Sequence, residues 1–242
     1  MSGGAFSSAS VSAATAAVPA SSPAPPSPSR RRFLSPIHLQ SLATVTILAI
    51  TGMVPTSDLA FAILSIPYTY FLAAIPFPSL TSGPVPSVFG DRNPILAKYV
   101  FAAAIIGIFL PIAYILEGIF NGDRESVNSA APHLFLLSFQ VFMEGVTFWR
   151  GFSIPVRAFI PLAFNSRRLF SIADWLRSEL GKEGLGFRLI AGKVLAMVNL
   201  ALWSFNLFGF LLPVYLPKAL KSSRSGCSVS LRNIACQNEQ FN

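Results

Sequence analysis

The sequence predicts an all-α, multi-pass transmembrane helical bundle of about five spans. Of its 242 residues, 52% are hydrophobic and 12% are charged, whereas a soluble domain has roughly 25% charged residues. The hydrophobic residues also gather in runs long enough to cross a bilayer, which takes about 20 helical residues. A soluble chain needs polar residues to cover its surface, and long stretches of this chain supply none. We therefore expect lipid to solvate most of it.

Five apolar runs are predicted to span the bilayer. They cover residues 37–54, 59–77, 95–120, 132–149 and 189–216. The first two form a helical hairpin, because only the sequence PTSD separates them and Pro55 and Asp58 mark a turn and a helix start. In the third run, Pro111 lacks a backbone N–H and frees the Gly107 carbonyl four residues back, so we expect a kink there.

The transmembrane domain is expected at residues 36–217, between two polar tails. Residues 1–35 are rich in Ser, Ala and Pro, which is typical of a disordered tail. Because no acidic residue precedes Asp58, a transit peptide is the alternative interpretation of this segment. Residues 218–242 are expected to form a polar, basic C-terminal tail.

Basic residues set the expected orientation. The stretch SRRRFLSP at residues 29–36 is expected to hold the N-terminus of the first span in the cytosol, because positive charge favours that side. The expected location is an endomembrane, with a plastid or mitochondrial membrane as the alternative if the N-terminal segment is a transit peptide. The net charge of +8 lies in loops between apolar runs, so we expect no nucleic-acid binding.

The segment between the fourth and fifth runs is expected to lie at the membrane surface. Residues 152–164 are apolar but too short to span, and Pro155 and Pro161 interrupt them, which predicts a re-entrant or interfacial segment. Residues 165–180 have apolar positions three and four apart, which is typical of an amphipathic helix. A basic helix packed on the bundle is the alternative. The predicted lipid-surface contacts are Arg167, Arg168, Trp175 and Arg177.

Polar side chains inside the fourth and fifth spans predict a buried site, because a charge at membrane depth costs roughly 2.5–3.5 kcal/mol. The candidates are His133, Gln140, Glu144, Asn199, Asn206 and Lys193. We expect Glu144 to pair with Lys193 or Arg157 across helices. Two interpretations stay open: bonds that only fix the helices, or a polar pathway for a proton or a small solute.

No arrangement of catalytic or metal-ligating type stands out in the sequence. The histidines, His38 and His133, have no acid at motif spacing, and the cysteines, Cys227 and Cys236, both lie in the C-terminal tail. There is no glycine-rich phosphate loop and no cluster of His, Cys and carboxylates. We therefore expect no enzymatic activity, no cofactor and no metal site.

The chain resembles a family of plant multi-pass membrane proteins known only as a domain of unknown function. The segments that carry the resemblance, in order, include YVFAAAIIGIFLPIAYILEGIFNGD, APHLFLLSFQVFMEGVTF and ALWSFNLFGFLLPVYLPKALK. The resemblance covers about residues 36–221, and the sequence after Lys221 departs from the family's ending. The resemblance implies an integral membrane protein of plant origin, and it implies no activity, ligand or catalytic residue.

Two classes of function are expected. The leading one is a non-enzymatic membrane component that acts through contacts with lipid or protein, with the bilayer, anionic lipids or a cytosolic protein as partner. The alternative is a small-solute or proton-coupled transporter or channel that uses the buried polar face around Glu144.

Overall fold

The computed structural model describes residues 36–78, 94–184 and 186–222, all within one compact unit. These residues are helical apart from short connections, and no strand occurs among them. The α-helices are α1 (Pro36–Ile50), α2 (Thr56–Ala74), α3 (Pro94–Ala104), α4 (Leu110–Phe120), α5 (Arg124–Trp149), α6 (Ile154–Gly181) and α7 (Phe187–Ser204). Two π-helical segments, η1 (Ile105–Phe109) and η2 (Phe205–Tyr215), continue α3 and α7. The predicted all-α class is confirmed for the described residues.

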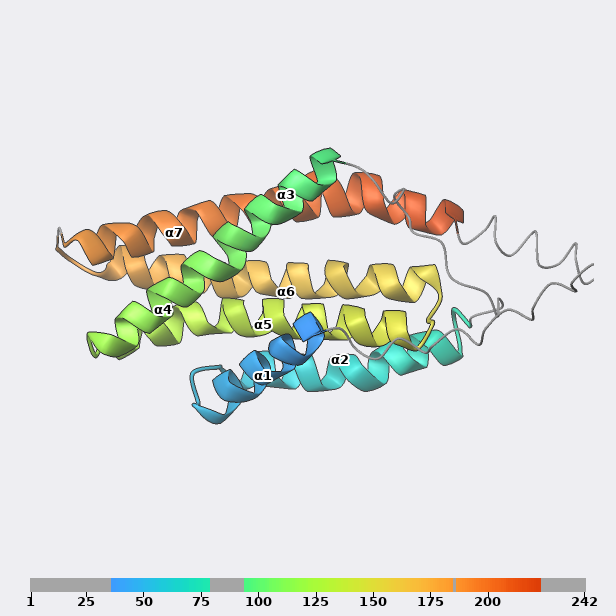
Figure 1. The fold of residues 1–242 in the computed structure, drawn as a ribbon, viewed down its shortest axis with the longest axis horizontal. Helices are drawn as coiled ribbons and strands as arrows, with labels where there is room; N and C mark the ends of the chain where they lie inside the picture. Colours follow the sequence, from blue (N-terminus) through green and yellow to red (C-terminus); the bar gives the residue numbers. More distant parts are fainter. Residues whose placement is uncertain (1–35, 79–93, 185, 223–242) are drawn as a thin grey trace, which may run out of the picture. The chain divides into compact units, whose positions relative to one another are not determined.

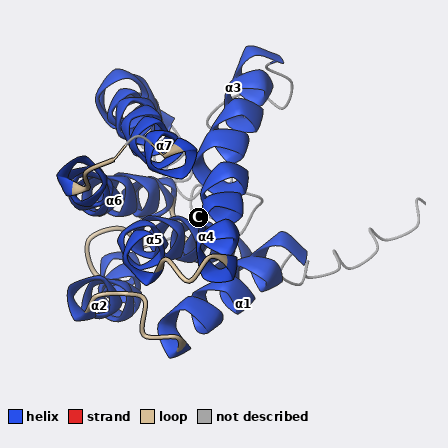
Figure 2. Ribbon diagram, turned by 90° about the vertical axis from the view of Figure 1, so that its left-hand side faces the viewer, coloured by secondary structure: helices blue, strands red, loops and turns tan. Residues whose placement is uncertain are grey.

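Helices α5 and α6 form the centre of this unit, and the other helices surround them. In Figure 1, α5 and α6 run side by side, with α7 along one flank and α1 and α2 along the other, and the continuous α3–α4 helix crosses diagonally from α7 to the end of α5. The view in Figure 2 places α5 between α6, α2 and α4. Helix α5 is buried along most of its length, including the unbroken run 130–137.

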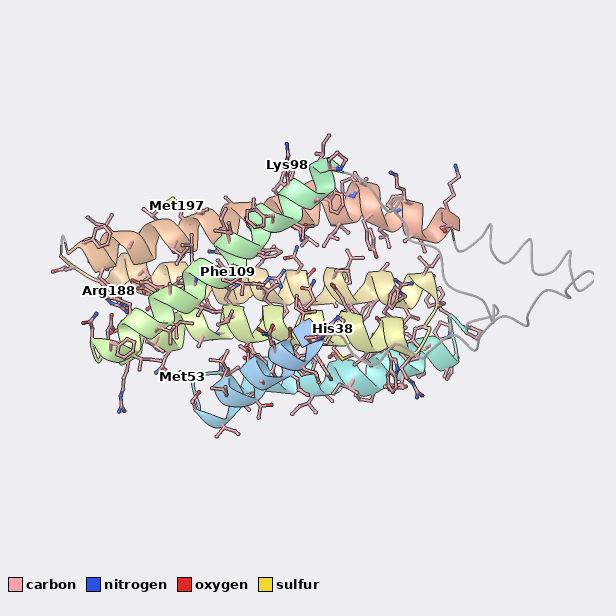
Figure 3. The ribbon with its side chains drawn as sticks, viewed as in Figure 1. His38, Met53, Lys98, Phe109, Arg188 and Met197 are labelled. Carbon is pink, nitrogen blue, oxygen red and sulfur yellow. The ribbon has the colours of Figure 1, made fainter. Side chains whose placement is uncertain are left out.

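The outer helices present apolar side chains to the surroundings. Large exposed hydrophobic residues lie on α1, α2, α3, α4, α7 and η2. Met197 of α7 is one of them and points away from the bundle in Figure 3. Most of the buried polar residues, in contrast, belong to α5 and α6. The described unit therefore has an apolar outside and a partly polar interior, which suits a lipid environment.

Three helices are long and apolar enough to cross a membrane. They are Thr56–Ala74, Ala97–Phe120 and Phe187–Ser222, and they correspond to the second, third and fifth predicted spans. The first predicted span is α1, which has only 15 residues, fewer than the roughly 20 that a bilayer requires. The fourth is part of α5, which is not among the sufficiently apolar helices. Length and composition of the described residues therefore support three spans.

The predicted re-entrant or interfacial segment at residues 152–164 is wrong. Residues 154–181 form one continuous helix, α6, with Pro155 in its first turn and Pro161 inside it. Proline is tolerated in a first turn because the N–H groups there have no partner within the helix. The predicted amphipathic helix at residues 165–180 is the second half of α6, and it packs in the centre of the bundle, as the alternative interpretation had it.

The irregular backbone expected at Pro111 takes the form of η1. The Gly107 carbonyl accepts a hydrogen bond from His133 Nε2 of α5 at 3.0 Å. The neighbouring carbonyl of Ile106 accepts one from Asn199 Nδ2 of α7 at 3.1 Å. Buried carbonyl groups need a donor, so these two side chains stabilise η1 from two different helices.

We expect His133→Leu to lower the free energy of unfolding by about 1–3 kcal/mol, because the buried Gly107 carbonyl loses its donor. In a Pro111→Ala background the loss should be smaller, since the restored backbone N–H at position 111 can donate to the same carbonyl. Equilibrium unfolding in mixed micelles, with dodecyl sulfate as denaturant, measures both losses. An equal loss in the two backgrounds would contradict the role assigned to His133.

Candidate functional site

Glu144 lies on α5 and is tied to a buried arginine through a glutamine. Its Oε1 accepts a hydrogen bond from Gln140 Nε2, one turn earlier on the same helix, at 2.8 Å. The Gln140 side-chain carbonyl accepts one from Arg168 Nη1 of α6, also at 2.8 Å. Arg168 is fully buried. Gln140 therefore connects a carboxylate and a guanidinium that do not contact each other directly.

Neutral groups surround the rest of the Arg168 guanidinium. Nη2 donates to Asn165 Oδ1 at 2.9 Å, and the guanidinium carbon lies 3.9 Å from the centre of the Trp203 ring. Asn165 in turn donates from Nδ2 to the Trp203 carbonyl at 3.2 Å. A buried guanidinium requires hydrogen bonds and a compensating charge. The Gln140 and Asn165 side chains accept the hydrogen bonds, the face of the Trp203 ring adds a cation–π contact, and Glu144, one glutamine away, supplies the compensating charge.

The hydrogen bonds continue into α7 and η1. Trp203 Nε1 donates to Asn199 Oδ1 at 3.2 Å, and Asn199 donates to the Ile106 carbonyl of η1. We call this set the buried network, and it consists of Gln140, Glu144, Asn165, Arg168, Asn199 and Trp203. It links α5, α6 and α7 through contacts between residues that are far apart in the sequence.

A cavity of about 540 Å³ lies beside Glu144. Residues of α1, α3, α5, α6 and η2 line it. The lining includes the polar side chains of His38, Tyr99, Gln140, Glu144, Arg157 and Asn206. Tyr99 Oη donates to Asn206 Oδ1 at 3.0 Å. Small ligands occupy cavities of roughly 300–1,000 Å³ with a few convergent polar groups. The cavity beside Glu144 has this size and this kind of lining.

Helix α1 closes one wall of the cavity. Figure 3 shows His38, at the start of α1, beside α5. A Cβ atom on Gly145 of α5 would lie only 2.5 Å from His38 Cδ2. The absence of a side chain at position 145 therefore lets the imidazole ring reach the backbone of α5 next to Glu144.

The structure brings three predicted site residues to the cavity, and these are Gln140, Glu144 and Asn206. Asn199 belongs to the buried network, and His133 bonds to η1. Lys193 lies elsewhere, because its Nζ donates to the Lys182 carbonyl at 3.2 Å. Among the ion pairs of the described residues, Glu144 pairs directly with neither Lys193 nor Arg157, but Arg157 lines the same cavity.

Two predicted lipid-surface contacts are wrong, because Arg168 and Trp175 are fully buried. The Trp175 ring packs against the rings of Tyr114 and His133, with centroid distances of 5.9 and 6.2 Å. On α6 the buried side carries both Arg168 and Trp175, while the exposed side carries both Phe170 and Arg177. The helix therefore lacks the separation of polar and apolar faces that an amphipathic surface helix has.

The other two predicted contacts, Arg167 and Arg177, are at least partly exposed. Arg167 pairs with Asp58 of α2 at 2.7 Å, and Arg177, with 78% of its side chain exposed, pairs with Asp174. Glu179, also on α6, is fully buried. It accepts a hydrogen bond from Tyr114 Oη at 3.0 Å, which anchors the end of α6 to α4.

Sequence reasoning missed the interior roles of Asn165 and Arg168. Both stand three residues apart on one face of a helix that also carries apolar residues. The charge of Arg168 within an apolar stretch could have indicated a buried position. It was assigned to the membrane surface instead. Within the described part of the chain, no three His, Cys, Asp or Glu residues gather closely enough to hold a metal ion.

The buried network and the cavity lie within a region that matches a known family. Residues 33–223 match Domain of unknown function (DUF7733). The chain belongs to the DUF7733 family. No curated protein and no solved structure matches the chain. The resemblance to a domain of unknown function is thereby confirmed, and the matched region contains every residue that the structure describes.

Proposed function

We propose that this DUF7733 protein is a non-enzymatic, multi-pass membrane protein that binds a small solute in the cavity beside Glu144. The observation that carries the proposal is a cavity of about 540 Å³ lined by Glu144 and Arg157, within helices whose outer surface is apolar. Charged groups at membrane depth are costly and mark substrate or ion pathways in membrane proteins. The plant origin and the endomembrane location expected above are part of this proposal.

The proposal includes six crossings, with α5 and α6 as the two polar ones. The connections α1–α2 and α4–α5 and the two facing ends of α6 and α7 lie at one end of the bundle in Figure 1, and the connection at 150–153 lies at the other. An even number of crossings puts both ends of the transmembrane domain on the same side. The basic residues of the C-terminal tail then share the cytosolic side with those at 30–32, as the distribution of positive charge favours.

Solute binding is the class that the geometry supports best. A component acting through lipid contacts was favoured by Arg168 and Trp175 on a surface helix, and both are buried. A transporter or channel was expected to use the polar face around Glu144. Glu144 lines the cavity, together with Gln140 and Asn206. A transporter or channel is accordingly the functional class that we propose.

Cysteine labelling tests whether the cavity is open to water. In a chain with Cys227 and Cys236 replaced by serine, we expect Asn206→Cys to react with a small charged methanethiosulfonate in proteoliposomes, because position 206 lines the cavity. The matched control is Phe208→Cys, on the same segment η2 but 64% exposed on the apolar outside. Lipid there suppresses formation of the reactive thiolate.

Intact-protein mass spectrometry measures the labelling of both variants, after size-exclusion chromatography has established that they are folded. Reaction at position 206 without reaction at position 208 supports a hydrated cavity. Equal reaction at both positions, or no reaction at position 206, overturns the proposed function.

A further inference from the structure

The charges at the cavity do not balance among the residues that the structure describes. Glu144 contributes one negative charge, whereas Arg157 and Arg168 contribute two positive ones. Glu144 is already engaged with Arg168 through Gln140. One guanidinium at this site is therefore left over, and it is that of Arg157.

Arg157 differs in this respect from Arg167, Arg177 and Arg188, which each pair directly with a carboxylate. Across the described ranges Arg157 makes no such direct pair, and its guanidinium carbon lies 4.5 Å from the centre of the Phe148 ring. Glu144 lines the same cavity, but its single negative charge also compensates Arg168. The excess positive charge is unfavourable in a low-dielectric site. An anionic ligand in the cavity would remove this cost.

The remaining wall of the cavity is apolar and reaches the outer surface. Phe210 and Leu211 of η2 and Phe148 of α5 line it together with Val100 of α3. Phe148 and Val100 are also 61% and 57% exposed on the apolar outside of the bundle. A molecule with an apolar body can therefore enter from the hydrocarbon side while its polar group reaches Arg157.

We propose that the ligand is an amphiphilic anion, a molecule with one carboxylate or phosphate group and an apolar body. The acidic group pairs with Arg157, since a guanidinium binds these groups through two parallel hydrogen bonds. The apolar body packs against Phe148 and Phe210. This assignment rests on the proposed function and adds the chemical class of the solute to it.

Binding of single-chain amphiphiles to the purified full-length protein in a neutral detergent tests the assignment. The probes are decanoate and decyl phosphate, with decanol and decyltrimethylammonium as neutral and cationic matches of equal chain length and inorganic phosphate as the chainless anion. We expect either anionic amphiphile to raise the midpoint of thermal unfolding in a concentration-dependent manner, because it binds the folded state. The three other probes should not.

Arginine variants identify the partner of the anion. Arg157→Gln should weaken decanoate binding at least tenfold, and Arg157→Lys, which keeps the charge, should weaken it less. Arg177→Gln is the matched control, because Arg177 is exposed and pairs with Asp174 away from the cavity, and it should bind as the parent does. Protection of Asn206→Cys from the thiol reagent by decanoate, but not by decanol, gives a second readout that needs no change at position 157.

The outcomes separate the ligand class from the cavity itself. If decanol binds as strongly as decanoate, or if Arg157→Gln binds decanoate as the parent does, the ligand does not need an acidic group and the proposal is wrong. If inorganic phosphate binds as strongly as decanoate, the ligand does not need an apolar body and a free anion is the ligand. If Asn206→Cys reacts but no anionic amphiphile binds or protects, the ligand class fails and the hydrated cavity stands. If Asn206→Cys does not react, the proposed function fails first.

Discussion

Arg168→Met is expected to lower the free energy of unfolding by about 3–5 kcal/mol, the cost of removing one partner from a buried charged pair. The substitution leaves the side-chain oxygens of Gln140 and Asn165 without donors and removes the guanidinium that is linked to Glu144 through Gln140. Methionine has a similar length and fills most of the space, so little of the loss comes from a cavity. Unfolding in mixed micelles measures the effect.

A double variant tests the link between Arg168 and Glu144. Because Glu144 and Arg168 are linked through Gln140, the loss of stability in the Glu144→Gln, Arg168→Met double variant should be smaller than the sum of the two single losses. Arg177→Met serves as the matched control, because it removes the same group from an exposed site, and its effect should stay within about 0.5 kcal/mol. A similarly small effect of Arg168→Met would mean that Arg168 is not buried in the bundle.

Trp175→Ala is expected to lower the free energy of unfolding by about 3–5 kcal/mol, as truncation of a buried aromatic side chain does. Trp175 lies between Tyr114 and His133, and removal of its indole leaves a large void among α4, α5 and α6. The comparison is Trp149→Ala, because Trp149 is 48% exposed at the end of α5 and should lose much less.

The same pair of variants separates a core role from an interfacial one. An interfacial anchor would affect association with vesicles more than stability, since its indole lies among the lipid headgroups. Equal losses of stability for Trp175→Ala and Trp149→Ala would argue for that role, and a clear difference in the expected direction would argue for the core.

Sequence could predict the helices and part of the site, because both depend on local properties. Long apolar runs form helices in any lipid-like environment, which is why α2, the α3–α4 helix and α7 were found. Glu144 and Gln140 were found because a charge within an apolar run is costly wherever the helix lies. Neither inference needs knowledge of which helices are neighbours.

The position of α6 could not be predicted in this way. Its periodicity shows two faces, but periodicity does not say which face points inward. In this bundle both sides of α6 are mixed, because Arg168 and Trp175 are inside while Phe170 and Arg177 are outside. Only the arrangement of α2, α5 and α7 around α6 decides between the two orientations.

Asn199 and Asn206 show a second limit of sequence patterns. A spacing of seven places two residues on one face of an α-helix, and both were listed as candidates for one buried site. The π-helical segment η2 begins at Phe205, between them, and changes the relation of the two faces. Asn199 therefore joins the buried network while Asn206 bonds to Tyr99 at the cavity.

The concentration of polar residues in α5 and α6 has a consequence for how the chain is made. Neither helix is apolar enough to partition into a bilayer on its own composition, and the translocon admits segments largely by hydrophobicity. The Trp203 ring, which contacts Arg168, and the Trp203 carbonyl, which accepts from Asn165, both belong to α7. Helix α7 leaves the ribosome after α6. We therefore expect α5 and α6 to settle in the bilayer only once α7 has been synthesised, so a chain that stops at Gly181 would fail to integrate correctly.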